Sequence, residues 1–227
     1  MRKVLLLALA LVAAMAVVAG ATVINSLHDM TSADGVGVTS DQVCEFCHHP
    51  HRGPALNVDG STLTTYLLWN INDFDVANYD VYTSGTMQGT GAAQVNATDA
   101  NAGTSYLCLS CHDGSISSVA KLPRTGPASW TAYTMQDYAN LGTTLEDDHP
   151  VNFTYPSTDP NIQLEGGDGD IDGVVTAVEY PLYGGEMQCA TCHDVHNGQS
   201  PKVQFMRGGT NDVITDSAIC RDCHLNK

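Results

Sequence analysis

Residues 44–48 read Cys-Glu-Phe-Cys-His, and the same C-x-x-C-H pattern returns at 108–112, 189–193 and 220–224. These four repeats use all eight cysteines of the 227-residue chain. C-x-x-C-H is the attachment pattern of c-type haem: the two thiols form thioether bonds to the haem, and the adjacent histidine ligates its iron. Disulfides and zinc sites also use cysteine pairs, but neither requires a histidine directly after every pair.

Each repeat would supply two attachment cysteines and one proximal iron ligand. The expected thioether cysteines are Cys44, Cys47, Cys108, Cys111, Cys189, Cys192, Cys220 and Cys223, and the expected proximal ligands are His48, His112, His193 and His224. Four apolar haem plates would provide much of the core, which suits a chain with 7% aromatic residues and 21 glycines. We therefore expect a multihaem c-type cytochrome with a mostly irregular backbone, short helices and a few short strands around a stacked haem chain. The stretch 92–110 is expected to be a longer helix that leads into the second repeat.

The N-terminus has the features of a secretory signal peptide. Arg2 and Lys3 precede an apolar run at 4–18, and Ala19-Gly20-Ala21 is a small-residue cleavage site. We expect residues 1–21 to be removed, which leaves one tetrahaem domain at 22–227; an uncleaved anchor helix is the alternative. No later run of about 20 apolar residues follows, so the mature form is expected to have no membrane span.

Charge and the leader together restrict the location and the partners. The formal net charge is −16, and loss of Arg2 and Lys3 with the leader takes it to −18. Such an acidic protein is repelled by phosphates, which argues against nucleic-acid binding. We expect an exported protein at the cell surface, with the periplasm as the alternative, that exchanges electrons with redox proteins or extracellular acceptors.

Five further histidines are available for the second axial position of four haems: His28, His49, His51, His149 and His196. Two histidine ligands leave no open position for a substrate, whereas a methionine ligand would raise the potential. The methionine alternatives are Met30, Met87, Met135, Met187 and Met206. His51 and His196 each follow a proximal histidine by three residues, and at about 3.5 Å per residue this link cannot pass around a porphyrin. If they are ligands, they serve a haem other than that of their own motif. His49 adjoins His48 and is interpreted as the spare.

Five stretches carry a resemblance to known proteins: LHDM at 27–30, CEFCHHPH at 44–51, LCLSCHDG at 107–114, DHPV at 148–151 and CATCHDVH at 189–196. Together they resemble a family of exported multihaem cytochromes, the OmcE-type tetrahaem outer-surface cytochromes of metal-reducing bacteria. The resemblance implies His28, His51, His149 and His196 as distal ligands. It also implies head-to-tail assembly into filaments with a continuous haem chain, in which a distal ligand near the N-terminal motif serves the neighbouring subunit. We expect that ligand to be His51.

A second metal signal is independent of haem. Residues 168–179 read DGDIDGVVTAVE and fit the calcium-loop pattern D-x-D-x-D-G-x5-E at every position. The expected calcium ligands are Asp168, Asp170, Asp172, Val174 through its carbonyl, Thr176 and Glu179. Pro160 and Pro181 flank the loop, so no EF-hand helix pair is expected, and a solvated acidic turn is the alternative.

The function expected from these features is electron transfer through four bis-histidine haems, as the subunit of a polymeric filament. No catalytic triad or phosphate loop is recognisable, so we do not expect an enzyme. One alternative is a soluble, monomeric periplasmic tetrahaem shuttle. A less favoured alternative is a multihaem reductase, which would need at least one five-coordinate haem.

Overall fold

The computed structural model describes residues 23–24, 26–31, 41–48, 55–56, 62–63, 69–70, 78–87, 90–91, 94–96, 103–114, 135–155, 180–196, 205–207, 220 and 223–224. All four C-x-x-C-H repeats have described cysteines and histidines, as do His28, His149 and His196. The expected leader at 1–21, His49, His51 and the expected calcium loop at 168–179 lie outside the described residues.

The elements of the described residues are short, as expected for a largely irregular chain. The helices are the 3-10 helices η1 (Val43–Phe46) and η5 (Asp137–Ala139) and the α-helices α2 (Gly103–His112) and α3 (Cys189–Cys192). The strands are β1 (Ala55–Leu56), β2 (Thr62–Leu63), β3 (Asn78–Val81), β4 (Thr90–Gly91), β5 (Gln94–Asn96), β6 (Thr144–Leu145), β7 (Phe153–Thr154) and β8 (Glu186–Met187).

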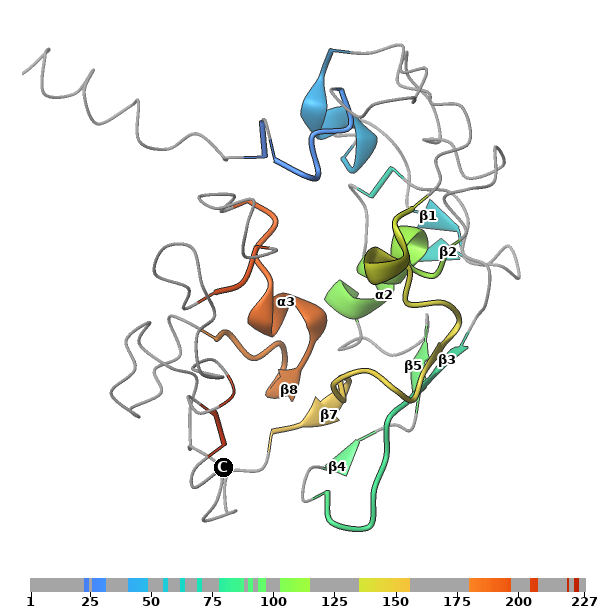
Figure 1. The fold of residues 1–227 in the computed structure, drawn as a ribbon, viewed down its shortest axis with the longest axis vertical. Coiled ribbons are helices and arrows are strands. Elements are labelled where there is room, and N and C mark those ends of the chain that lie inside the picture. The colour runs from blue at the N-terminus through green and yellow to red at the C-terminus, as the bar shows by residue number, and fades with distance from the viewer. Residues whose placement is uncertain are drawn as a thin grey trace, which may run out of the picture.

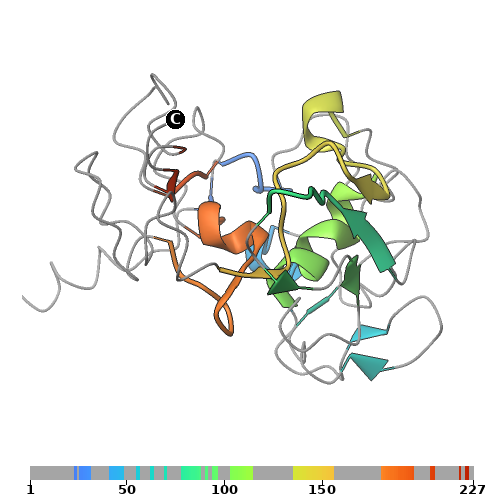
Figure 2. The ribbon, with the colours of Figure 1, turned by 90° about the horizontal axis from the view of Figure 1, so that it is seen from below.

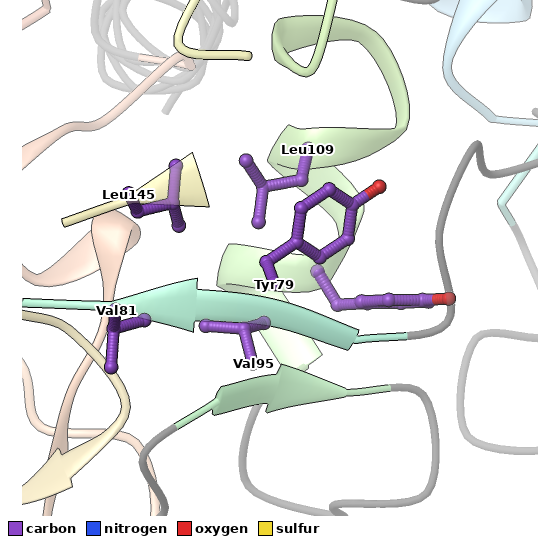
Figure 3. Close-up of a cluster of buried hydrophobic side chains, with 6 residues drawn as sticks. Tyr79, Val81, Val95, Leu109 and Leu145 are labelled. Atoms are coloured by element: carbon purple, nitrogen blue, oxygen red, sulfur yellow. The ribbon is translucent and has the colours of Figure 1, made fainter. Parts of the chain in front are cut away.

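The largest apolar cluster among the described residues lies between α2 and a small mixed sheet of order β5-β3-β6 (Figure 3). Strand β3 is antiparallel to β5 and parallel to β6. Tyr79 and Val81 of β3 are buried while Asp80 between them is exposed, which is the alternation of a strand with one face on a core. Val95 of β5, Tyr106 and Leu109 of α2, and Leu145 of β6 complete the cluster. This core therefore holds the helix that carries the second repeat.

Helix α2 is shorter than expected from the sequence. Residues 94–96 form strand β5 instead of helix, and the helix begins only at Gly103. The expectation of one helix over 92–110 was wrong because Val95 is fully buried in the sheet, where a β-branched side chain packs well. The helix ends at His112, and Gly114 follows with φ +87°, a left-handed conformation that favours glycine after a helix.

The second and third repeats lie side by side in the centre of the molecule. Helices α2 and α3 are neighbours in both views (Figures 1 and 2). A second sheet of order β4-β7-β8 leads into α3, because β8 is separated from it by Gln188 alone. Within the part of the chain that the structure describes, no helix is long and apolar enough to cross a bilayer.

Candidate haem-binding sites

The C-x-x-C-H repeats share one local conformation, a single helical turn. The histidine N–H donates to the carbonyl of the first cysteine at 2.8 Å in the first repeat, 3.0 Å in the third and 2.7 Å in the fourth. The second repeat forms the last five residues of α2. None of the eight cysteines forms a disulfide, so each is available for a thioether bond. The chain thus presents four similar turns, each with two thiols and an imidazole.

Three histidine pairs bring residues from distant parts of the chain together. The ring centroids are 6.0 Å apart for His48 and His196, 5.9 Å for His28 and His112, and 6.3 Å for His149 and His224. Two imidazoles on opposite faces of one iron would have centroids about 6 Å apart, because metal–nitrogen bonds are about 2 Å long. Each pair joins one proximal histidine to one histidine expected to be distal. The spacing therefore fits a pair of axial ligands in all three cases.

Two of these rings are oriented by carbonyl groups of the backbone. His112 Nδ1 lies 2.8 Å from the Ala139 carbonyl oxygen, and His149 Nδ1 lies 2.9 Å from the Pro150 carbonyl oxygen. A carbonyl only accepts, so Nδ1 carries the proton in both rings. This tautomer leaves Nε2 with a lone pair for a metal, the usual arrangement of a ligating histidine.

His28 lies in the most crowded of the three pairs. Its ring meets Phe205 edge-on, with centroids 4.6 Å apart, and its buried Nδ1 has no hydrogen-bond partner. Burial, together with the nearby His112 and His193, lowers the pKa of His28 to about 4. Burial likewise lowers the pKa values of His48 and His112. The imidazoles are thus held neutral, which is the form that binds iron.

Trp69 and Asn70 hold the first repeat against the second. Trp69 forms a β-bridge with His48, its ring packs edge-on at 5.8 Å, and its Nε1–H donates to Ser110 Oγ at 3.3 Å. The fully buried Asn70 donates its backbone N–H to the Cys47 carbonyl at 2.9 Å and its side-chain amide to the Glu45 carbonyl. The first haem turn is therefore fixed by a segment that lies about twenty residues further along the chain.

The third repeat contacts both the second and the fourth. The interaction between the neighbouring thiols of Cys108 and Cys189 lowers the pKa of Cys189 and, together with burial, raises that of Cys108. Tyr155 lies beside the thiols of Cys192 and Cys223. Burial, together with the neighbouring Cys223, raises the pKa of Cys192 to about 12. The third turn is thus central among the four.

A hairpin-like return braces the C-terminal side of the third repeat. Arg207 donates from Nε to the Ala190 carbonyl at 3.0 Å and pairs with Asp194 at 3.1 Å. His193 forms a β-bridge with Met206.

Of the methionine alternatives, Met187 is buried in an apolar cluster with Phe153. Among the described residues, no group of three or more His, Cys, Asp or Glu side chains could hold a metal ion.

The C-terminal repeats match a known family model. Residues 181–227 match the model described as a doubled CXXCH motif, which spans the third and fourth repeats. This part of the chain is a multihaem c-type cytochrome-like region. The C-x-x-C-H motifs imply covalently bound haem c and a role in electron transfer. No curated protein matches the chain.

Sequence reasoning did not single out several residues that position these turns. The side chains of Ser105 and Gln188 form a hydrogen bond that links α2 to the start of α3. The side-chain amide of Asn70 donates to the Glu45 carbonyl in the first turn. A signal was present only in part: Ser105 lies three residues before Cys108, and Gln188 lies one before Cys189. Polar residues next to attachment cysteines are candidates for such a role, but their partners become visible only in three dimensions.

Proposed function

We propose that the mature protein is a tetrahaem electron-transfer protein with bis-histidine haems that assembles into an extracellular filament. The observation that carries the proposal is the coincidence of four C-x-x-C-H turns with three histidine pairs at 5.9–6.3 Å. When bound, each haem iron would exchange one electron between its ferric and ferrous forms. The protein residues attach the haems, fill both axial positions and set the distances between neighbouring haems.

The pairs support an allocation of three distal ligands. His196 serves the haem of the first repeat with His48, His28 serves that of the second with His112, and His149 serves that of the fourth with His224. This allocation leaves His51 for the haem of the third repeat, in its own chain or in a neighbouring subunit. His49 remains the spare. Both axial positions of each haem are then filled by protein, which suits electron transfer better than catalysis on a substrate.

The filament rests on the resemblance to OmcE-type cytochromes and on one physical argument. A mature formal charge near −18 opposes self-association, so a stable contact between copies needs a strong specific bond. An iron–histidine bond from His51 to a neighbour would be such a bond. A head-to-tail contact that does not close on itself produces a fibre.

The test combines haem analysis with microscopy of the secreted protein. We expect four haems per chain, an all-low-spin spectrum and filaments. His51→Ala should abolish the filaments and change the ligation of one haem per subunit. A monodisperse monomer from the unmodified gene would instead support the periplasmic shuttle. A high-spin haem in that protein would support the reductase. Filaments that persist in His51→Ala with four bis-histidine haems would move the role to His49 or His28.

A further inference from the structure

We propose that Ser105 and Gln188 form a positioning bracket that fixes the spacing between the second and third haem-attachment turns, and with it the electronic coupling of those two haems. The inference rests on the proposed function, because it concerns how the haems are held relative to each other. Ser105 belongs to α2 and Gln188 immediately precedes α3, so the bracket joins the two helices that carry these repeats.

Ser105 is the side of the bracket on the second repeat. Its side chain is fully buried and lies one helical turn before Cys108. Its Oγ–H donates to Gln188 Oε1 at 2.5 Å, and its Oγ accepts the backbone N–H of Cys189 at 2.9 Å. One hydroxyl of the second turn is therefore bonded both to the third turn's attachment cysteine and to the residue before it.

Gln188 is the side of the bracket on the third repeat, and its amide is held in one orientation. Its Oε1 accepts from Ser105, while its Nε2 donates to Asn152 Oδ1 at 3.0 Å. Its backbone N–H donates to Thr191 Oγ1 at 2.9 Å, and Thr191 donates in turn to the Pro181 carbonyl at 3.0 Å. The side chains of all four residues are buried, at 0–1% exposure.

Asn152 anchors the far end of the bracket in an uncommon backbone conformation. Its φ is 60°, in the left-handed region where few residues other than glycine are found and where asparagine is enriched. The backbone N–H of Asn152 donates to the Met187 carbonyl at 2.7 Å. Asn152 is therefore hydrogen-bonded to both Met187 and Gln188, the two residues directly before Cys189. The surrounding structure thus holds a costly conformation to keep this amide in place.

The bracket ends at two cysteines that would carry the haems. Ser105 lies three residues before Cys108, and its hydroxyl accepts the backbone N–H of Cys189. With the haems attached, both cysteine sulfurs would be thioethers, and the spacing of the two turns would set how closely the two haem edges approach. Electron exchange falls steeply with that distance.

A polar bracket does what apolar packing between the helices would not. Apolar contacts tolerate small shifts of one helix along another, whereas a buried hydrogen-bond network is satisfied in only one register, and an unpaired member costs free energy. The bracket therefore defines one relative position of the two turns. We assign Ser105 and Gln188 as positioning residues, because neither would touch iron.

The experiment uses the haem-loaded, secreted protein. Ser105→Ala removes the hydroxyl, and Gln188→Met removes both polar atoms at similar volume. The double variant tests whether the two act as a unit. Ser84→Ala is the matched control, because the Ser84 hydroxyl forms an exposed hydrogen bond to Thr86, two residues away in the same segment. The measurements are haem content by peptide mapping, spin coupling between haems by electron paramagnetic resonance, and midpoint potentials by spectroelectrochemistry.

We expect every variant to keep four low-spin haems. In Ser105→Ala and Gln188→Met, the spin coupling of one haem pair should weaken and its midpoint potentials should shift. The double variant should show no larger change than the stronger single variant. Spin coupling and potentials equal to those of Ser84→Ala, with only a lower melting temperature, would overturn the proposal and leave a purely structural role.

Two further outcomes are distinguishable. Should Ser105→Ala not mature, Ser105→Thr and Ser105→Val replace it, because threonine and valine have the same shape and only threonine keeps the hydroxyl. A weakened spin coupling in the valine variant alone supports the bracket, and equal coupling in both overturns it. If the unmodified protein lacks low-spin haems at Cys108–Cys111 or Cys189–Cys192, the proposed function and the bracket both fail.

Discussion

The imidazole ring of His196 lies nearly parallel to that of His48, with ring centroids 6.0 Å apart and ring planes inclined by only 20°. The two residues belong to different repeats, since His48 ends the first and His196 follows the third by three residues. The pair therefore ties the first haem turn to the third. It makes His196 the most direct site at which the proposed ligand allocation can be tested.

His196→Met should raise the reduction potential of one haem and leave the other three near their original values. A thioether ligand raises the potential relative to imidazole, within the roughly 0.8 V range that axial ligands span. Spectroelectrochemistry measures the shift, and a band for methionine ligation should accompany it. His49→Ala is the control and should leave all four potentials unchanged. Unaltered potentials in His196→Met would contradict the allocation.

His149→Ala should open one axial position on the fourth haem. His149 pairs with His224 at 6.3 Å, and its Nδ1 bond to the Pro150 carbonyl leaves Nε2 for iron. The reduced variant should bind about one equivalent of carbon monoxide and show a high-spin signal, whereas the unmodified protein should do neither. A variant that stays entirely low-spin and binds no carbon monoxide would remove His149 from the ligand set.

Tyr79→Phe should reduce the free energy of unfolding by about 1–3 kcal/mol, because a buried carboxylate acceptor loses a donor. The Tyr79 hydroxyl donates to Asp113 Oδ2 at 2.8 Å, and Asp113 directly follows the proximal ligand His112. Denaturant unfolding at constant haem content gives the value. Tyr138→Phe is the matched control, since Tyr138 is 67% exposed and should change stability little. Equal effects in the two variants would show that the Asp113 contact contributes nothing.

Asp170→Ala should lower the calcium content of the purified protein from about one ion per chain towards none. Asp170 occupies the third position of the proposed loop, where a carboxylate oxygen binds the ion. Elemental analysis after dialysis without chelator measures the content. Asp99→Ala removes a carboxylate outside the loop and should leave the calcium content unaltered. Absence of calcium from the unmodified protein would favour a solvated acidic turn.

The sequence was sufficient for features that depend on local chemistry. Their spacing predicts the attachment cysteines and proximal histidines, because the haem attachment pattern is confined to five consecutive residues. The structure gives these repeats a common helical turn, with the same backbone hydrogen bond in three of them. The start of α2 was not predictable from the sequence, because residues 94–96 form a strand in which Val95 is buried. Tertiary packing overrides local helix preference at such positions.

The tertiary structure decides which histidines lie together and which polar side chains form hydrogen bonds. The composition left five histidines for the distal positions, and nothing in their order along the chain says that His28 lies against His112 or His196 against His48. The contact between Ser105 and Gln188 is equally invisible in the sequence. The two residues lie far apart along the chain and meet because α2 packs against α3. Covalent haem attachment is a short-range property that residue spacing encodes. Ligand pairing and haem spacing are long-range properties. They depend on how the small sheets and the buried hydrogen bonds place the four short turns relative to one another.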